Sequence, residues 1–154
     1  IYPALRREIP EVQFYMAGRN MPQHLYQLQS SSLNIEGEIT QPLKYQEDKA
    51  IMIVPLLTAS GTRAKIIEGM ALGKTIISTS IGALGVLCTD GENILIADTT
   101  EEFVIQLKKC TSIKFCRKIG ANARQHAFNE YDYISCGRKF IELYTELLNP
   151  TRGK

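Results

Sequence analysis

Two short apolar runs, with a helical segment between them, constrain the fold of this chain more than any other feature. Residues 50–55 (AIMIVP) and 75–80 (TIISTS) are short and lie beside Pro and Gly, which is typical of buried parallel strands. The segment from about Thr62 to Leu72 has helical periodicity and stops at Gly73. We therefore predict a strand–loop–helix–strand unit. In such sheets, ligands bind at the carboxyl ends of the strands, beside helix N-termini.

The same alternation of strand and helix continues along the chain. We predict further strands at 12–17, 33–37 and 94–97, and helices near 22–29, 42–46, 113–129 and 133–148, with one more from a cap at Asp98, Thr99 or Thr100 to about Lys109. Short loops between alternating elements indicate an α/β fold with a doubly wound, Rossmann-like parallel sheet. Residues 1–154 are expected to form a single domain. Its first ten residues resemble a helix that leads into a strand, which suggests a piece of a longer chain.

Composition excludes several classes of function. The formal net charge is +2, and no Lys/Arg cluster is dense enough to indicate nucleic-acid binding. The four cysteines form no Cys-x-x-Cys pair and the two histidines have no partner motif, so we predict no metal site and free thiols in a reducing cytoplasm. No apolar run approaches the ~20 residues that a membrane span needs.

The predicted helix from about Thr62 to Leu72 begins with charges that are unfavourable at a helix N-terminus. Ser60 or Thr62 can cap it, but Arg63 and Lys65 follow, and cations near a helix N-terminus are disfavoured by roughly 0.3–1 kcal/mol each. A bound diphosphate would remove this mismatch, because helix N–H groups and cations would then face one anion. Helical spacing directs Arg63 toward the crevice above the sheet and Lys65 toward solvent or Glu68. The alternative is a solvated Arg63 and a weak Lys65–Glu68 surface pair.

Several motifs follow one another in a recognisable order. They are Pro10 through Gly18, then Val54-Pro55, then EGMALGKTIIST at residues 68–79, then Ile81-Gly82, Asp90-Gly91-Glu92-Asn93 and the tail from Ala121 to Leu148. This set resembles the C-terminal, nucleotide-sugar-binding domain of retaining glycosyltransferases of the GT-B fold, family 4. The resemblance implies the C-terminal half of a GT-B fold, with the family's first strand of this domain and its N-terminal acceptor domain preceding residue 1.

The resemblance also implies roles for individual residues. Glu68 matches the family glutamate that binds the donor's ribose hydroxyls, whereas Ser60 stands where the family has another glutamate, which contacts the sugar. The form Ser-Gly-Thr-Arg-x-Lys resembles a subgroup in which this loop contacts phosphate or sugar. The candidate donor-binding residues are therefore Gly18, Ser60, Gly61, Thr62, Arg63, Lys65, Glu68 and Gly82. Arg63 and Glu68 are the candidates for stabilising the donor, and no catalytic residue is assigned.

The glycines have two interpretations. Gly18, Gly82 and Gly85 are either turn residues with positive φ or positions where the backbone approaches a nucleotide closely. We favour the second interpretation for Gly18 and Gly82, since both follow predicted strands.

The function implied by the resemblance is transfer of a sugar from a nucleotide-diphosphate donor to a saccharide or lipid-linked acceptor, with retention. Surface polysaccharide or glycolipid synthesis is the expected pathway, in the cytoplasm or at the inner face of the membrane, with membrane association only through the full-length protein. No metal or other cofactor is expected, and no Asp-x-Asp motif occurs. The chain alone is expected to be inactive. The alternatives are an epimerase- or phosphorylase-like GT-B enzyme and a non-catalytic Rossmann-like binding module.

Overall fold

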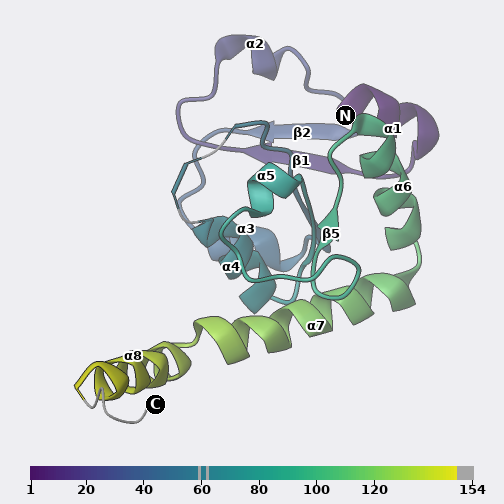
Figure 1. Ribbon diagram of the computed structural model, residues 1–154. Helices are drawn as coiled ribbons and strands as arrows, with labels where there is room; N and C mark the ends of the chain where they lie inside the picture. Colours follow the sequence, from purple (N-terminus) through teal and green to yellow (C-terminus); the bar gives the residue numbers. More distant parts are fainter. Residues whose placement is uncertain (59, 62, 149–154) are drawn as a thin grey trace.

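The computed structural model describes residues 1–58, 60–61 and 63–148, and it contains the predicted elements in the predicted order (Figure 1). The strands are β1 (Phe14–Ala17), β2 (Leu33–Glu36), β3 (Ile51–Val54), β4 (Thr75–Ser78) and β5 (Leu95–Ile96). The helices are α1 (Tyr2–Glu8), α2 (Gln23–Tyr26), α3 (Pro42–Glu47), α4 (Ala64–Ala71), α5 (Ser80–Ala83), α6 (Thr100–Cys110), α7 (Ile113–Tyr131) and α8 (Tyr133–Leu148). Most elements are a few residues shorter than predicted, because periodicity locates an element better than it locates its ends.

All strand pairs are parallel, as predicted, but the described strands form two sheets. β1 pairs with β2, Phe14 lying opposite Leu33, and β4 pairs with both β3 and β5. The prediction of a single sheet therefore differs from the structure. Alternation along a sequence predicts which segments are strands, but it does not decide which strand edges meet.

Helices cover both faces of the β3–β4–β5 sheet, so the sheet is doubly wound. Successive side chains of a strand point to opposite faces, and neighbouring residues of β4 enter different cores. Ile77 packs in a cluster with residues of α1 and α6, whereas Ile76 packs in a second cluster with residues of α4 and α7. The first cluster includes Leu5, Ile9, Leu95, Phe103 and Leu107, and the second includes Ile66, Met70, Ala83, Ile94 and Ala123.

Glycines allow the close packing around α4. A Cβ atom on Gly69 would lie 3.0 Å from the Met52 sulfur, and one on Gly120 would overlap the Gly73 carbonyl oxygen. Gly73 has a φ of +70°, which ends α4 in the left-handed conformation. These glycines allow α4 to lie close to β3 and β4, and α7 to lie close to the end of α4.

The C-terminal helix α8 differs from the others. It projects from the body of the domain beyond α7 (Figure 1), and none of its residues is buried. Within the described residues, no helix is both long and apolar enough to cross a membrane.

Candidate functional site

Hydrogen bonds join three loops at the carboxyl edge of the β3–β4–β5 sheet. Thr79, after β4, donates from Oγ1 to the carbonyl oxygen of Leu56, after β3, at 2.5 Å. Ser80 donates to Asp98, after β5, from both its backbone nitrogen (2.7 Å) and its hydroxyl (2.9 Å). The edge at which α/β sheets bind ligands is therefore held together by the protein's own side chains.

The one-turn helix α5 begins directly on this edge. Thr79 is its N-cap, and its hydroxyl accepts a hydrogen bond from the backbone nitrogen of Gly82 at 2.9 Å. A Cβ atom on Gly82 would lie 2.5 Å from Ser78 Oγ and 3.0 Å from the Val54 carbonyl oxygen. Gly82 is therefore needed where α5 packs against the ends of β3 and β4.

The structure separates the two interpretations of the glycines. Neither Gly18 nor Gly82 has a positive φ, so the turn interpretation is wrong for both. Gly85 has a φ of +83° with open space around its α-carbon, so that interpretation is confirmed there. The close approach at Gly82 is to the protein's own atoms, and an approach to a nucleotide at Gly18 or Gly82 stays a prediction.

Arg63 folds back over the loop that precedes α4. Its Nη1 atom donates to the carbonyl oxygen of Ser60 at 2.6 Å and also to that of Gly61, which has a φ of +77°. Its Nε atom is buried and has no hydrogen-bond partner among the described residues. Arg63 is thus half-buried and bonded to its own loop, unlike the solvated cation of the alternative interpretation.

Among the described residues, no side chain caps the N-terminus of α4. Ser60 is not the N-cap as predicted, because the helix begins at Ala64 and Arg63 occupies the N-cap position. Thr62 itself lies outside the described residues. The first turn contains no acidic residue, so the helix dipole meets no carboxylate there. Backbone N–H groups at such a terminus attract an anion.

Lys65 and Glu68 form an ion pair on the exposed side of α4. The Lys65 Nζ atom lies 2.9 Å from Glu68 Oε2, and the two side chains are 65% and 40% exposed. Exposed pairs of this kind contribute about 0–1 kcal/mol to stability. Glu68 can therefore exchange Lys65 for a ligand hydroxyl at small cost.

Gly18 lies beside the β1–β2 sheet and not beside the β3–β4–β5 sheet. It follows β1, and its backbone nitrogen donates to the Gly37 carbonyl oxygen, after β2, at 3.1 Å. Beside it, Arg19 and Glu38 form an ion pair at 2.5 Å. The hydrogen bonds that join the loops after β3, β4 and β5 therefore do not include Gly18.

Sequence reasoning missed Thr79, Ser80 and Asp98 as parts of this edge. A signal was present, because Asp98 directly follows the predicted strand at 94–97, and Thr79 and Ser80 are small polar residues at the end of the predicted run 75–80, where an N-cap or a loop contact is common. The partner of each residue could not be read from that signal.

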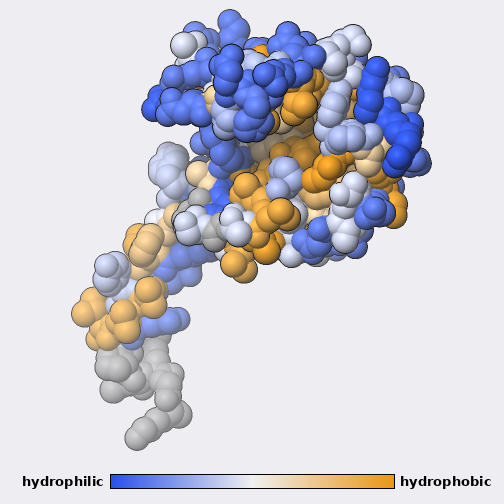
Figure 2. Space-filling view, turned by 90° about the horizontal axis from the view of Figure 1, so that it is seen from above, coloured by the Kyte–Doolittle hydropathy of each residue, from blue (hydrophilic) through white to orange (hydrophobic). Residues whose placement is uncertain are grey.

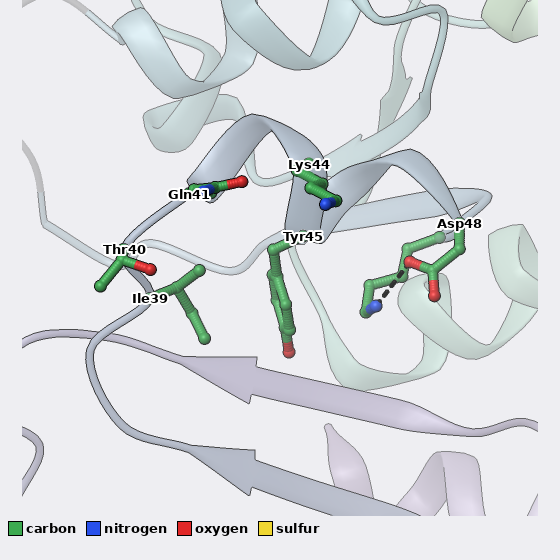
Figure 3. A pocket seen from close by; sticks show the side chains of 7 residues that line it. Ile39, Thr40, Gln41, Lys44, Tyr45 and Asp48 are labelled. Carbon is green, nitrogen blue, oxygen red and sulfur yellow. Dashed lines mark hydrogen bonds and ion pairs between the residues drawn. The ribbon is translucent and has the colours of Figure 1, made fainter.

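A hollow of about 320 Å³ lies apart from this edge, beside α3 (Figure 3). It is lined by Ile39, Thr40, Gln41, Lys44, Tyr45, Asp48 and Lys49. Figure 3 shows Tyr45 pointing from α3 toward the strands, and the Lys49 ammonium lies 4.2 Å from its ring centroid and 4.4 Å from that of Tyr15. Burial raises the pKa of the Tyr45 hydroxyl, and this oxygen has no partner among the described residues.

The described residues hold no cluster of three or more His, Cys, Asp or Glu side chains that could bind a metal ion. All four cysteines are free thiols. Burial raises the pKa of Cys110 to about 12, so this thiol is a core residue rather than a nucleophile.

Comparisons with known proteins agree with this architecture. A family model described as glycosyl transferases group 1 matches residues 1–112, and a search of curated proteins gave no match. Among solved structures, HepE of Anabaena in complex with UDP has a TM-score of 0.78 at 16% identity, over 93% of this chain and 43% of that chain. A glycosyltransferase of Rickettsia africae has a TM-score of 0.74 at 20% identity, over 98% and 43%.

A third solved structure, sucrose-phosphate synthase of Thermosynechococcus elongatus, has a TM-score of 0.71 at 18% identity, over 96% of this chain and 41% of that chain. This chain thus spans about two fifths of the length of these relatives. Identities this low show the fold alone. The predicted fold class, a parallel α/β domain that is half of a GT-B fold, is confirmed.

Proposed function

This chain belongs to the glycosyl transferases group 1 family, and from that premise we propose that it is the C-terminal, donor-binding domain of a retaining, family 4 glycosyltransferase. The full polypeptide transfers a sugar from a nucleotide-diphosphate donor to a saccharide or lipid-linked acceptor. The acceptor site lies on a second domain of the same polypeptide, so the chain alone binds the donor but does not transfer the sugar.

The observation that carries this proposal is the N-terminus of α4. Its first turn has no acidic residue, and a half-buried arginine stands at its N-cap; among the described residues no side chain caps the helix or accepts a hydrogen bond from the arginine Nε. Each feature is unfavourable in the absence of an anion. A diphosphate at this position would accept hydrogen bonds from the helix amides and from Arg63 together.

The chemistry required of such a site is electrostatic. When the glycosidic bond to the donor breaks, negative charge develops on the leaving diphosphate, and fixed donors stabilise that charge most effectively. The α4 amides and the Arg63 guanidinium are the donors that this edge offers. Since these groups supply positive potential themselves, we propose that transfer needs no metal ion.

Glu68 is proposed to bind the ribose hydroxyls of the donor. Its carboxylate is 40% exposed and held only by Lys65 in the described structure, so two hydroxyls can replace that partner at small cost. The relatives support a nucleotide donor, since HepE was solved with UDP and with UDP-glucose. We further propose surface polysaccharide or glycolipid synthesis at the cytoplasmic side of the membrane.

Calorimetric titration with UDP, GDP and ADP in the presence of EDTA tests the proposal. We expect base-selective binding that Arg63→Ala weakens by about 1.5–3 kcal/mol, the range for hydrogen bonds to charged groups. Arg19→Ala is the matched control, because Arg19 is an exposed arginine paired with Glu38 on the other sheet. Equal losses in the two variants, or no binding of any nucleotide, would contradict the donor site.

A further inference from the structure

Two of the four cysteines lie together where α6 turns into α7. Cys110 is the last residue of α6, and Cys116 lies in the first turn of α7. Cys116 packs against the buried cluster that contains Cys110. Cys88 packs against the other cluster and Cys136 against neither, so among the described residues only Cys110 and Cys116 share a cluster.

The two thiols differ in their exposure to solvent. Cys110 is only 6% exposed, whereas Cys116 is half-buried and lines a second hollow, of about 270 Å³, at the start of β4. Burial, followed by the neighbouring Cys116 sulfur, raises the pKa of Cys110 to about 12. An effect of one sulfur on the other requires the two atoms to be close. A solute in the hollow therefore meets Cys116 first, with Cys110 behind it.

Thr75, the first residue of β4, fixes the position of Cys116. The Thr75 side chain is fully buried, and its Oγ1 atom donates to the Cys116 carbonyl oxygen at 2.7 Å. The same Oγ1 atom lies 3.2 Å from the Cys116 sulfur. Because a hydroxyl has one proton, the Cys116 thiol donates in this second contact. Once the thiol ionises, the Thr75 proton can turn to the thiolate instead.

The walls of this hollow are charged. Three cations line it, namely Lys49, Lys74 and Arg117, together with Glu47 and Asp48. Lys49 is paired with Asp48 at 2.6 Å, and the buried Lys74 ammonium donates to the Glu47 carbonyl oxygen at 2.8 Å. A partly exposed cysteine beside cations is the usual setting of a thiol that reacts with oxidants.

We propose that Cys110 and Cys116 form a reversible disulfide bond when hydrogen peroxide enters this hollow, so that the turn between α6 and α7 is a site of oxidative modification. The Cys116 thiolate attacks one peroxide oxygen, an S–O bond forms as the O–O bond breaks, and the departing hydroxide takes a proton to become water. The Cys110 sulfur then attacks the Cys116 sulfur. An S–S bond forms as the S–O bond breaks, and the hydroxide that leaves takes the Cys110 proton as a second water. The two thiols lose two electrons, and the peroxide gains them.

The place of the pair in the fold separates this site from the proposed donor site. Thr75 begins β4, whereas the loops of the proposed donor site follow the carboxyl ends of the strands. The disulfide would join α6 to α7 at the opposite edge of the sheet, and the proposal does not depend on the donor chemistry. In a reducing compartment such a bond is transient, as in proteins that sense oxidants.

Peptide mapping tests the proposal directly. Trypsin cleaves after Lys109, Lys114 and Arg117, so it places the two cysteines on different peptides. The reduced chain is treated with hydrogen peroxide in the presence of EDTA, its free thiols are blocked with N-ethylmaleimide, and it is digested without reductant. We expect mass spectrometry to find the two peptides joined, and dithiothreitol to separate them. Dimedone added during the reaction should label Cys116 and not Cys110.

Variants test the order of the two steps. Cys116→Ser should slow the loss of the Cys110 thiol roughly tenfold or more, because the buried thiol then has no partner that peroxide can reach. Cys110→Ser should stop the reaction at the sulfenic acid of Cys116. Cys136→Ser is the matched control, since Cys136 is also half-buried but donates to the Glu130 carbonyl oxygen at 3.7 Å, and it should leave the disulfide unchanged.

Three outcomes would overturn the proposal. They are maleimide on both peptides after peroxide treatment, a disulfide that joins two copies of the chain, and equally fast loss of the Cys110 thiol in Cys116→Ser. The first two are measured on the unchanged chain, so they decide the matter even where a variant fails to fold.

Discussion

Replacing Gly82 by alanine tests how tightly α5 packs on the sheet edge. The new methyl group would lie 2.5 Å from Ser78 Oγ and 3.0 Å from the Val54 carbonyl oxygen. The Ser78 hydroxyl cannot move freely, because it donates to the carbonyl oxygens of Thr79 (3.0 Å) and Val54 (3.3 Å). The Val54 oxygen belongs to the backbone at the end of β3, and it cannot yield without moving the strand.

The expected cost follows from these contacts. Overpacking a well-packed site costs about 1–3 kcal/mol. If α5 shifts to relieve the overlap, its N-cap bond to Thr79 weakens, at a further cost of about 1 kcal/mol. We therefore expect the free energy of unfolding to fall by about 2–4 kcal/mol, which lowers the Tm of a chain of this size by roughly 4–16 °C.

Urea unfolding followed by circular dichroism measures this loss. Gly137→Ala is the matched control, because Gly137 lies in α8 without a positive φ, and the new methyl group would have no neighbouring atom within 4 Å. Alanine should be neutral there or stabilise by up to about 1 kcal/mol. An unfolding midpoint for Gly82→Ala equal to that of the unchanged protein would refute the packing argument.

Three further predictions follow from other contacts. Glu68→Gln should weaken UDP binding but leave inorganic diphosphate binding unchanged, and calorimetry showing equal losses would disprove the ribose role. Thr99 forms a capping box with Glu102 at the start of α6, so Thr99→Ala should lower the free energy of unfolding by about 1 kcal/mol, whereas an unchanged urea midpoint would count against the cap. Burial raises the pKa of Cys110 from 9.0 to about 12, so its stabilising contribution is complete below pH 9 and is lost as pH rises toward 12. Iodoacetamide at pH 8 should leave Cys110 unmodified in the native protein and alkylate it after unfolding, and mass spectrometry showing rapid native alkylation would contradict its burial.

Much of the architecture could be predicted from local patterns. The run at residues 75–80 predicted β4 because short apolar runs beside Gly favour strands, and the helix after Thr99 was predicted from its cap and its periodicity. The cation at the start of α4 was noticed because it opposes the helix dipole, a property of neighbouring residues. These features need only a few residues of context, so one sequence is sufficient to find them.

The candidate donor-binding site at the start of α4 could be predicted only in part. Arg63 and Lys65 were placed correctly at the start of α4, and Lys65 does pair with Glu68. Ser60 is not the N-cap, since the helix begins at Ala64, two residues later than the periodicity indicated. Local propensity could not predict that Arg63 donates hydrogen bonds to the carbonyl oxygens of Ser60 and Gly61.

By itself, the sequence determined the alternation of strands and helices, the parallel α/β class and the unusual charge at the start of α4. Periodicity, caps and helix dipoles depend on residues close together in the chain, so they can be recognised in the sequence without knowledge of the fold. Only the tertiary structure decided that Gly82 must be a glycine, that Thr79 binds the loop after β3, and that no described residue covers the apolar side chains of α8 (Figure 2). Thr79 and Leu56 are 23 residues apart, and no local pattern states which distant atoms will share an edge of the sheet.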